Sequence, residues 1–185
     1  MLDLHYNNRN LKLAIDKIIY HPEFFTCTIL NWQKLLKREK YKITILEELK
    51  FLVHSNKIIL YAYCIMDNHI HLIWQIKGEV HPSIIKRSFL TRTAQYFKKD
   101  LKINHPNILE YFKSTQDDRK NHFWERRALG IDLFTEKVFE QKLDYIHRNP
   151  VKANLCENKE DYKYSSASFY LTGKDYLNIL THYRA

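Results

Sequence analysis

Two histidines near the middle of the chain have a spacing that suits metal binding. His69 and His71 lie in the segment HIHLIWQI (69–76), whose apolar, β-branched composition predicts a strand. Side chains alternate between the two faces of a strand, so both imidazoles point the same way, while Ile70 and Leu72 point toward a core. Two imidazoles on one face can share a divalent cation.

The histidine pair also has a plainer interpretation, as two half-exposed side chains with no ligand role. A zinc site would require further His or Cys ligands at standard spacing, and the sequence has none there. The oxygen-bearing side chains of Tyr63, Asp67 and Asn68 lie nearby in the sequence. Oxygen ligands favour Mg²⁺ or Mn²⁺ over zinc.

A tyrosine in the last quarter of the chain has a position that suits nucleophilic chemistry. Residues 135–148 predict a helix that Pro150 ends, with Thr135 as its cap. The apolar side of this helix is formed by Val138, Phe139, Leu143 and Ile146. Tyr145 lies about 120° from the centre of that stripe, and Asn149 returns to the tyrosine's side. With 13 tyrosines in the chain, an ordinary packing or surface role for Tyr145 is the alternative.

The remaining pattern alternates strands with helices, and asparagine and aspartate at 67–68 predict a turn. The expected elements are a strand at 23–32, a helix at 43–55, a hairpin of strands at 57–66 and 69–76, a basic helix from Pro82 to about Lys102, a polar loop at 103–122, and a short strand around 123–129. No linker or repeat divides the chain, so we expect one domain over 1–185.

Composition restricts the function further. A net charge of +9 and a pI near 9.3 favour a polyanionic partner, nucleic acid before an anionic membrane surface. Residues 80–127 hold 11 Lys and Arg against 5 Asp and Glu, although such a run can also be a solvated face. The three glycines lie far apart, which excludes the Gly-rich phosphate loops of P-loop and Rossmann proteins.

The location expected from sequence is the cytoplasm, in association with the nucleoid. Three dispersed cysteines form neither a disulfide framework nor a thiolate zinc site. Residues 1–17 lack the apolar run of a signal peptide, and no stretch approaches the ~18 apolar residues of a membrane span.

The two chemical segments together resemble the REP-associated tyrosine transposases, a branch of the single-tyrosine HUH transposases. The resemblance rests on His69-Ile70-His71 and on YIHRNPVKA (145–153). The segments FWERR (123–127) and YSSA (164–167) add to it, because all four stretches occur in the family's order. The resemblance covers about residues 20–170.

The resemblance implies an α+β fold, in which a ferredoxin-like antiparallel sheet carries helices packed on one face, the HUH endonuclease core. It implies Tyr145 as the nucleophile, with His69, His71 and Asn149 as ligands of Mg²⁺ or Mn²⁺. Relatives often have glutamine at the position of Asn149. The implied activity cleaves and rejoins single-stranded DNA near imperfect hairpins through a 5′-phosphotyrosine, which keeps the energy of the phosphodiester bond.

Basic side chains in and after the predicted helix could follow the DNA backbone. They are Lys86, Arg87, Arg92, Lys98, Lys99, Arg126, Arg127 and Lys152. Among them lie four aromatic residues that could stack on unpaired bases: Tyr96, Phe97, Phe123 and Trp124. Each of these four is expected more often in a core than on a stacking surface.

Two other functions remain open at this point. One is a catalytically idle relative that only binds hairpin DNA, and the other is a metal-dependent nuclease that uses water and forms no covalent intermediate. A homodimer whose tyrosine helix serves the partner's histidines and a monomer are equally compatible with the sequence. The hairpin sequence and the group that deprotonates the tyrosine are not encoded in any motif of the chain.

Overall fold

The protein is built on an antiparallel sheet of four strands. The computed structural model describes residues 20–114 and 121–185. The strands are β1 Glu23–Thr28, β2 Ile58–Ile65, β3 His69–Ile76 and β4 Leu129–Asp132, in the order β2-β3-β1-β4. All neighbouring strands are antiparallel. The crossovers from β1 to β2 and from β3 to β4 each pass one intervening strand, which is the ferredoxin-like topology expected from sequence.

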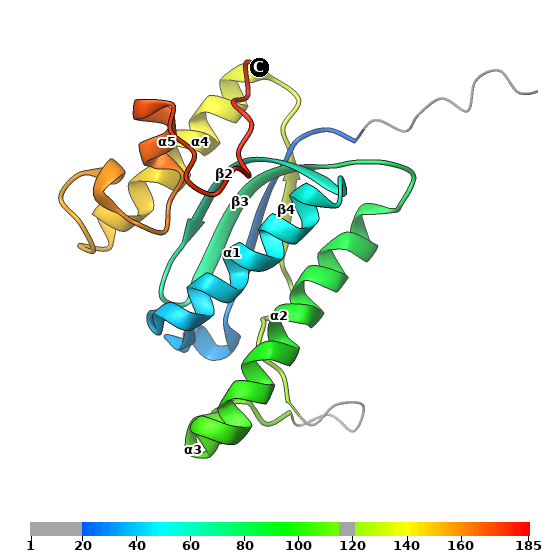
Figure 1. Cartoon of the computed structure of the whole chain (residues 1–185), viewed down its shortest axis with the longest axis vertical. Coiled ribbons are helices and arrows are strands. Elements are labelled where there is room, and N and C mark those ends of the chain that lie inside the picture. The colour runs from blue at the N-terminus through cyan, green and yellow to red at the C-terminus, as the bar shows by residue number, and fades with distance from the viewer. Residues whose placement is uncertain (1–19, 115–120) are drawn as a thin grey trace, which may run out of the picture.

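Two helices cover one face of this sheet (Figure 1). They are α1 Glu39–His54 and α2 Pro82–Asn104, and α2 begins with proline at a position where its missing N–H costs nothing. The core beneath them includes Ile45, Leu49, Leu72, Trp74 and Phe89, all fully buried. Alternate residues of β3 therefore point into this core, as the strand pattern predicts.

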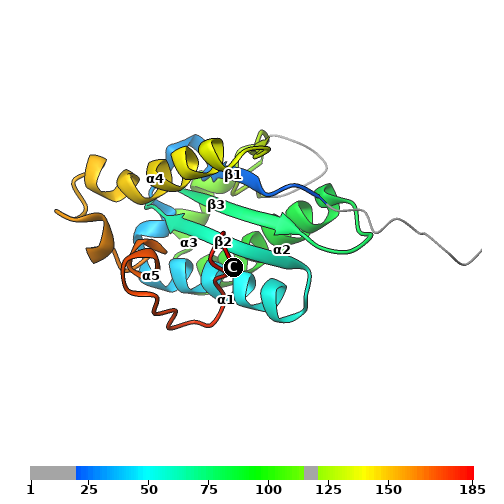
Figure 2. The same cartoon turned by 90° about the horizontal axis from the view of Figure 1, so that it is seen from above.

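Helix α4, Glu136–Lys152, lies against the opposite face of the sheet (Figure 2). Its apolar side packs on a second, smaller core that includes Phe24 and Ile73. The expectation that the helices share one face is therefore correct for α1 and α2 and wrong for α4. This difference matters for function because the odd-numbered residues of β3, including both histidines, face α4.

Several element boundaries differ from the sequence prediction. The first strand ends at Thr28, because residues 30–32 turn through two left-handed conformations at Asn31 and Trp32. The last strand is Leu129–Asp132, whereas the preceding residues contribute only an isolated bridge between Trp124 and Ile29. A lone bridge does not make a strand, so the prediction at 123–129 is shifted by several residues.

Helix α4 also continues past Pro150, where the sequence predicts its end. Proline removes the one hydrogen bond that its own N–H would donate to the preceding turn, and the helix ends two residues later, at Lys152. Thr135 caps the other end as expected, with its Oγ1 accepting from the Val138 N–H at 3.3 Å.

The segment predicted as a loop at 103–122 is partly helical. It contains the end of α2, the short helix α3 Pro106–Leu109 and a 3-10 turn in which Phe112 is buried. A further short helix, α5 Ala167–Thr172, lies near the C-terminus. No helix of residues 20–114 and 121–185 is long and apolar enough to cross a bilayer. The prediction about a signal peptide concerns residues 1–17, which lie outside the described residues.

Candidate active site

Strand β3 brings the two histidine rings together. The ring centroids of His69 and His71 lie 4.7 Å apart, on the face of the sheet that α4 covers. The intervening Ile70 is fully buried on the other face. The alternation predicted from the sequence is confirmed, because each residue type lies on the face assigned to it.

Both histidines are held through the same ring nitrogen. Nδ1 of His71 lies 2.7 Å from the Thr26 hydroxyl on β1, and Nδ1 of His69 lies 2.7 Å from Oδ1 of Asn68. An amide oxygen only accepts, so His69 carries its proton on Nδ1 and has a lone pair on Nε2. Metal-binding histidines are commonly oriented by a hydrogen bond to the nitrogen that does not bind the metal.

The other nitrogen of His71 has an unusual environment. Its Nε2 atom is buried and has no hydrogen-bond partner within residues 20–114 and 121–185. A buried polar atom without a partner is costly in a folded protein, and a bound metal is one of the few groups that would satisfy it. The donor set therefore fits a divalent cation at the histidine pair.

Burial keeps both imidazoles in the form that binds metal. It lowers the pKa of His71 to about 3, and the neighbouring His69 and the ammonium group of Lys142 lower it further. Burial also lowers the pKa of His69. Both rings are therefore neutral at pH 7, with a lone pair available on one nitrogen.

Helix α4 places Tyr145 beside this pair. Its ring centroid lies 5.4 Å from that of His71, and 5.9 Å from that of Phe24 on β1. The side chain is 41% exposed, so Tyr145 lies off the apolar stripe as predicted, while Leu143 and Ile146 are buried. The tyrosine and the histidines of one chain thus meet without a second subunit.

Two lysines flank the tyrosine ring. The ammonium nitrogens of Lys142 and Lys152 lie 5.7 Å and 5.6 Å from its centroid, one from each direction along α4. Lys142 is also 4.8 Å from the Phe24 ring, which holds it on the sheet side. Both ammonium groups therefore lie beside the ring that carries the phenol oxygen.

A buried contact fixes the position of α4 against the sheet. Nε2 of His147 lies 2.9 Å from Oγ of Ser166, and this Oγ accepts from the N–H of Tyr63 on β2 at 3.0 Å. The motif residues after the tyrosine and the segment at 164–167 therefore share a structural role. No sequence pattern predicts this contact, because His147 and Ser166 meet only once α4 lies on the sheet.

Asn149 is near the tyrosine but its ligand role is not tested by the geometry. Its side-chain amide donates to the Tyr145 carbonyl at 2.8 Å, one turn back along α4. No hydrogen bond or ring contact joins Asn149 to either histidine among the described residues. The described part of the chain likewise has no group of three or more His, Cys, Asp or Glu side chains that could hold a metal. A third protein ligand would therefore have to be of another type, such as an amide.

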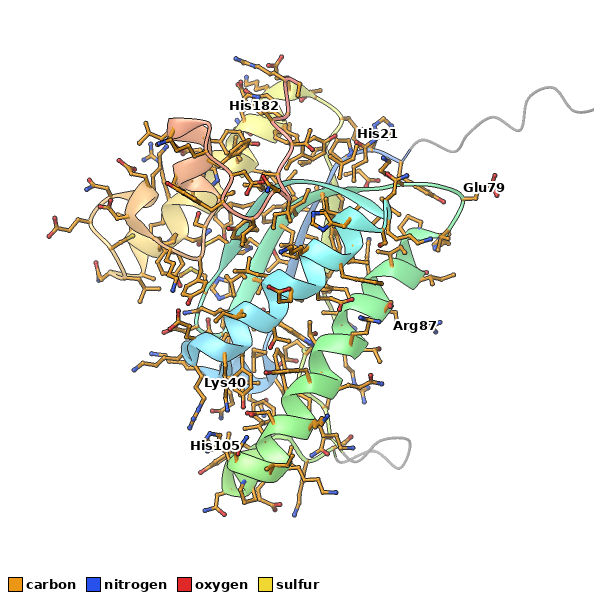
Figure 3. All side chains as sticks on the ribbon, in the orientation of Figure 1. His21, Lys40, Glu79, Arg87, His105 and His182 are labelled. Atoms are coloured by element: carbon orange, nitrogen blue, oxygen red, sulfur yellow. The ribbon has the colours of Figure 1, made fainter. Side chains whose placement is uncertain are left out.

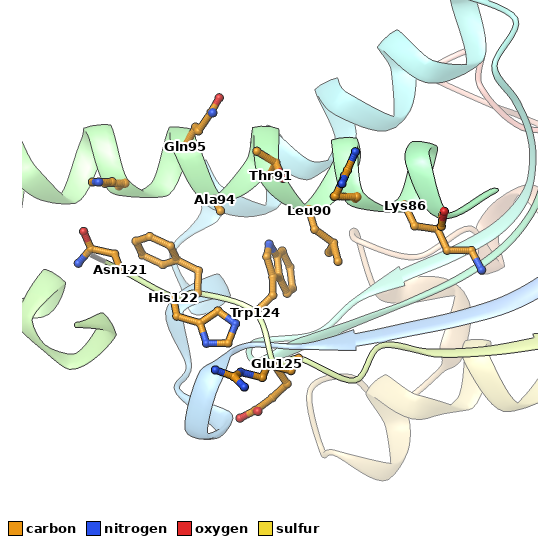
Figure 4. Close-up of a pocket in the computed structure, with 14 residues that line it drawn as sticks. Lys86, Leu90, Thr91, Ala94, Gln95, Asn121, His122, Trp124 and Glu125 are labelled. Carbon is orange, nitrogen blue, oxygen red and sulfur yellow. The ribbon is translucent and has the colours of Figure 1, made fainter. Parts of the chain in front are cut away.

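Part of the predicted DNA-binding set lines a groove between α2 and residues 121–126 (Figure 4). The groove has a volume of about 680 Å³ and an apolar floor of Leu90, Ala94 and Trp124. Its basic lining includes Lys86, Arg87, Lys98 and Arg126. Arg87 extends away from the body of the protein (Figure 3). Arg127 lines an adjoining hollow of about 560 Å³, together with Arg126.

Two members of the basic set have carboxylate partners. Lys86 pairs with Glu23, a buried residue on β1, and Gly130 on β4 leaves room for this pair, because a Cβ atom there would overlap the Glu23 carboxylate. Arg92 pairs with Glu48 at 2.7 Å. Lys99 lies apart, in a depression between α1 and α2. The DNA-binding role of these residues stays a prediction.

The aromatic residues suggested as stacking surfaces are mostly core. Phe97, Phe123 and Trp124 are at least 96% buried, since none is more than 4% exposed, and their rings contact one another. Their apolar area is used in packing α2 on the sheet, so a stacking role is wrong for these three. Only Tyr96 of the set is exposed.

The sheet has ferredoxin-like topology, and its His-x-His strand faces a tyrosine carried on a helix, as the resemblance to the single-tyrosine HUH transposases implies. The chain is similar to a protein named as a REP-associated tyrosine transposase, which confirms the resemblance seen in the sequence. It is 30% identical over 106 residues to the Haemophilus influenzae protein named "Putative REP-associated tyrosine transposase". The match covers 57% of this chain and spans 56% of the relative's length.

A solved structure supports the fold. The structure of a REP-associated tyrosine transposase bound to a REP hairpin superimposes with a TM-score of 0.59 and 18% identity, over 87% of this chain and 86% of the other. No protein-family model matches the chain.

Proposed function

We propose that the protein cleaves and rejoins single-stranded DNA next to a hairpin, with Tyr145 as the nucleophile. The observation that carries this proposal is the meeting of the exposed Tyr145 ring with the buried His71 ring at 5.4 Å. A phenol beside two neutral imidazoles, one of which has an unpartnered Nε2 atom, is a site arranged for metal-assisted attack rather than for packing.

His69 and His71 would hold Mg²⁺ or Mn²⁺ through their Nε2 atoms, and Asn149 is the proposed third protein ligand. When bound, such a cation polarises a non-bridging phosphate oxygen and offsets the charge that repels a nucleophile. To bind such a cation, the protein must hold two neutral imidazoles in fixed orientations. Thr26 and Asn68 do so through Nδ1 of each ring.

Tyr145 would form a bond from its phenol oxygen to phosphorus as the bond to the 3′ oxygen breaks. The products are a 5′-phosphotyrosine and a free 3′-hydroxyl, which takes up the proton equivalent lost from the phenol. The reverse attack by a 3′-hydroxyl rejoins DNA, so no nucleotide cofactor is needed. Lys142 and Lys152 lie where they would stabilise negative charge developing on the phenol oxygen.

Hairpin DNA is the substrate class that we propose. The named relative and the solved structure support it, since the latter holds a REP hairpin. On this chain, Arg87, Lys98 and Arg126 line the groove between α2 and residues 121–126. Cations of this kind attract a phosphate backbone without reading its sequence.

The test is a covalent adduct on a denaturing gel, after incubation with hairpin-bearing single-stranded DNA and Mn²⁺. We expect an adduct with the wild type and with Tyr176→Phe, which changes a fully surface-placed tyrosine, and none with Tyr145→Phe. An adduct that persists in Tyr145→Phe would contradict the nucleophile assignment. Cut DNA without an adduct would indicate a nuclease that uses water.

The histidine variant separates catalysis from binding. His69→Ala should abolish cleavage and leave the dissociation constant for DNA within a few-fold, because phosphate contacts supply most of the affinity. DNA binding by the wild type without cleavage under any metal would identify the protein as an idle hairpin-binding relative.

A further inference from the structure

Trp32 is exposed in a way that sets it apart from the other tryptophans. The chain has three, of which Trp74 is fully buried and Trp124 is 4% exposed, whereas Trp32 is 63% exposed. An indole ring carries a large apolar area, and leaving it in water forgoes the free energy that burial would supply. This exposure therefore needs a local explanation.

The backbone around Trp32 is strained. Asn31 and Trp32 are consecutive residues with φ angles of 53° and 56°, in the left-handed region. Asparagine tolerates this conformation, but tryptophan does so at a cost of about 1–2 kcal/mol. The strain does not serve burial, since the turn directs the indole into solvent.

Hydrogen bonds from a distant part of the chain hold this turn. The N–H of Leu30 donates to the Phe123 carbonyl at 2.8 Å, and the N–H of Asn31 donates to a carboxylate oxygen of Glu125 at 2.7 Å. Trp32 N–H donates to the Ile29 carbonyl at 2.9 Å. The turn is thus fixed in place, and its ring has a defined position on the surface.

That position is next to the histidine pair. The ring centroids of Trp32 and His69 lie 6.0 Å apart. Asn68 connects the two residues, because its Nδ2 donates to the Trp32 carbonyl at 3.4 Å while its Oδ1 accepts from His69. One side chain therefore orients a proposed metal ligand and the exposed indole together.

The surroundings of the turn carry positive charge. Lys34 and Lys37 are exposed just after it, and Asn31 lies on the rim of the 560 Å³ hollow that Arg126 and Arg127 line. An exposed indole with cations on both sides has the composition of a platform for single-stranded nucleic acid.

We infer that Trp32 stacks on an unpaired nucleobase adjacent to the phosphate at the His69–His71–Tyr145 site. The inference rests on the proposed function and adds Trp32 to it as a positioning residue. It also implies that the base next to the attacked phosphate is unstacked from its neighbours in the bound DNA. Stacking by an indole is tolerant of base identity, so Trp32 would fix the register of the strand and leave its sequence to be recognised elsewhere.

Tryptophan fluorescence provides the first test, because the other two indoles are buried. We expect single-stranded DNA carrying a hairpin to reduce acrylamide quenching of the wild type. An abasic nucleotide next to the cleaved position should restore the quenching, whereas abasic nucleotides farther away should not. Quenching that DNA leaves unchanged, in a protein that forms the Tyr145 adduct, would overturn the inference while the proposed function stands.

Substitution provides the second test. Trp32→Gly relieves the left-handed strain, so we expect an unchanged or higher Tm together with about tenfold weaker DNA binding; Trp32→Phe should retain most of the affinity. Tyr176→Ala is the matched control, since Tyr176 is 83% exposed and should leave both values unchanged. DNA affinity in Trp32→Gly equal to that of the wild type would contradict a stacking role.

Discussion

The Thr26 hydroxyl lies 2.7 Å from Nδ1 of His71, across the β1–β3 pairing that sets the two residues opposite each other. Since Nδ1 is occupied, the buried Nε2 atom is the nitrogen left for a ligand. The orientation of one proposed metal ligand thus depends on a threonine 45 positions away in the sequence.

Thr26→Val should therefore lower the affinity of the histidine pair for a divalent cation without disturbing the fold. Valine keeps the shape of threonine but removes the hydrogen bond that orients the imidazole. We expect Mn²⁺ affinity to fall about tenfold to a hundredfold. The measurement is the Mn²⁺ dependence of adduct formation, with the Mn²⁺-induced rise in Tm as a second readout. Thr44→Val is the control, because that hydroxyl donates to the Lys40 carbonyl on α1. An unaltered Mn²⁺ requirement would remove Thr26 from the site.

Lys142→Gln should slow adduct formation about tenfold. The variant removes a cation 5.7 Å from the Tyr145 ring, where negative charge develops as the phenol reacts. It should not raise the Mn²⁺ requirement, because the same ammonium group opposes positive charge near His71. Lys137→Gln, an exposed lysine of the same helix, should react at the wild-type rate. Equal rates in the two variants would show that the flanking charge has no role.

The His147 contact predicts acid sensitivity. Burial lowers the pKa of His147 to about 4, so between pH 6.5 and about 4 the unfolded chain binds a proton that the folded chain does not. Stability from this group is complete above pH 6.5 and is lost as the pH falls, by roughly 2 kcal/mol at pH 5. Urea unfolding at pH 7.5 and pH 5 measures the loss. His147→Gln should show a smaller difference between the two pH values, and an identical difference would refute the assignment.

Neighbouring cations on α2 should behave differently from each other. Lys86→Met leaves the buried Glu23 without its ion-pair partner and should reduce the free energy of unfolding by about 2 kcal/mol. Arg87→Gln should leave stability within about 0.5 kcal/mol. Its effect should be weaker DNA binding, with a salt dependence reduced by about one counterion. Unchanged stability in Lys86→Met together with a large loss of stability in Arg87→Gln would contradict the roles assigned to both residues.

The residues that would carry out the chemistry are easier to predict from the sequence than the residues that orient them. Strand alternation alone places His69 and His71 together, and helical periodicity alone leaves Tyr145 exposed. Those patterns depend on neighbours within a few residues. Thr26 and Ser166 could not be found in the same way, since each reaches its histidine only through the tertiary arrangement of β1, β3 and α4.

The errors have the same origin. Trp124 looks like a nucleic-acid aromatic until its indole N–H is seen donating to Thr93 on α2 at 3.0 Å. Trp32 falls within the strand predicted at 23–32 because aromatic side chains favour strands, and no glycine marks the left-handed turn. Contacts between segments far apart in the sequence decide both cases.

Both faces of strand β3 are buried. Leu72 and Trp74 lie in the larger core under α1 and α2, and His71 and Ile73 lie on the face that α4 covers. Gaining or losing one residue within the strand would exchange its faces, sending imidazoles into the larger core and apolar side chains toward Tyr145. We therefore expect β3 to tolerate changes of residue type during evolution far better than changes of length.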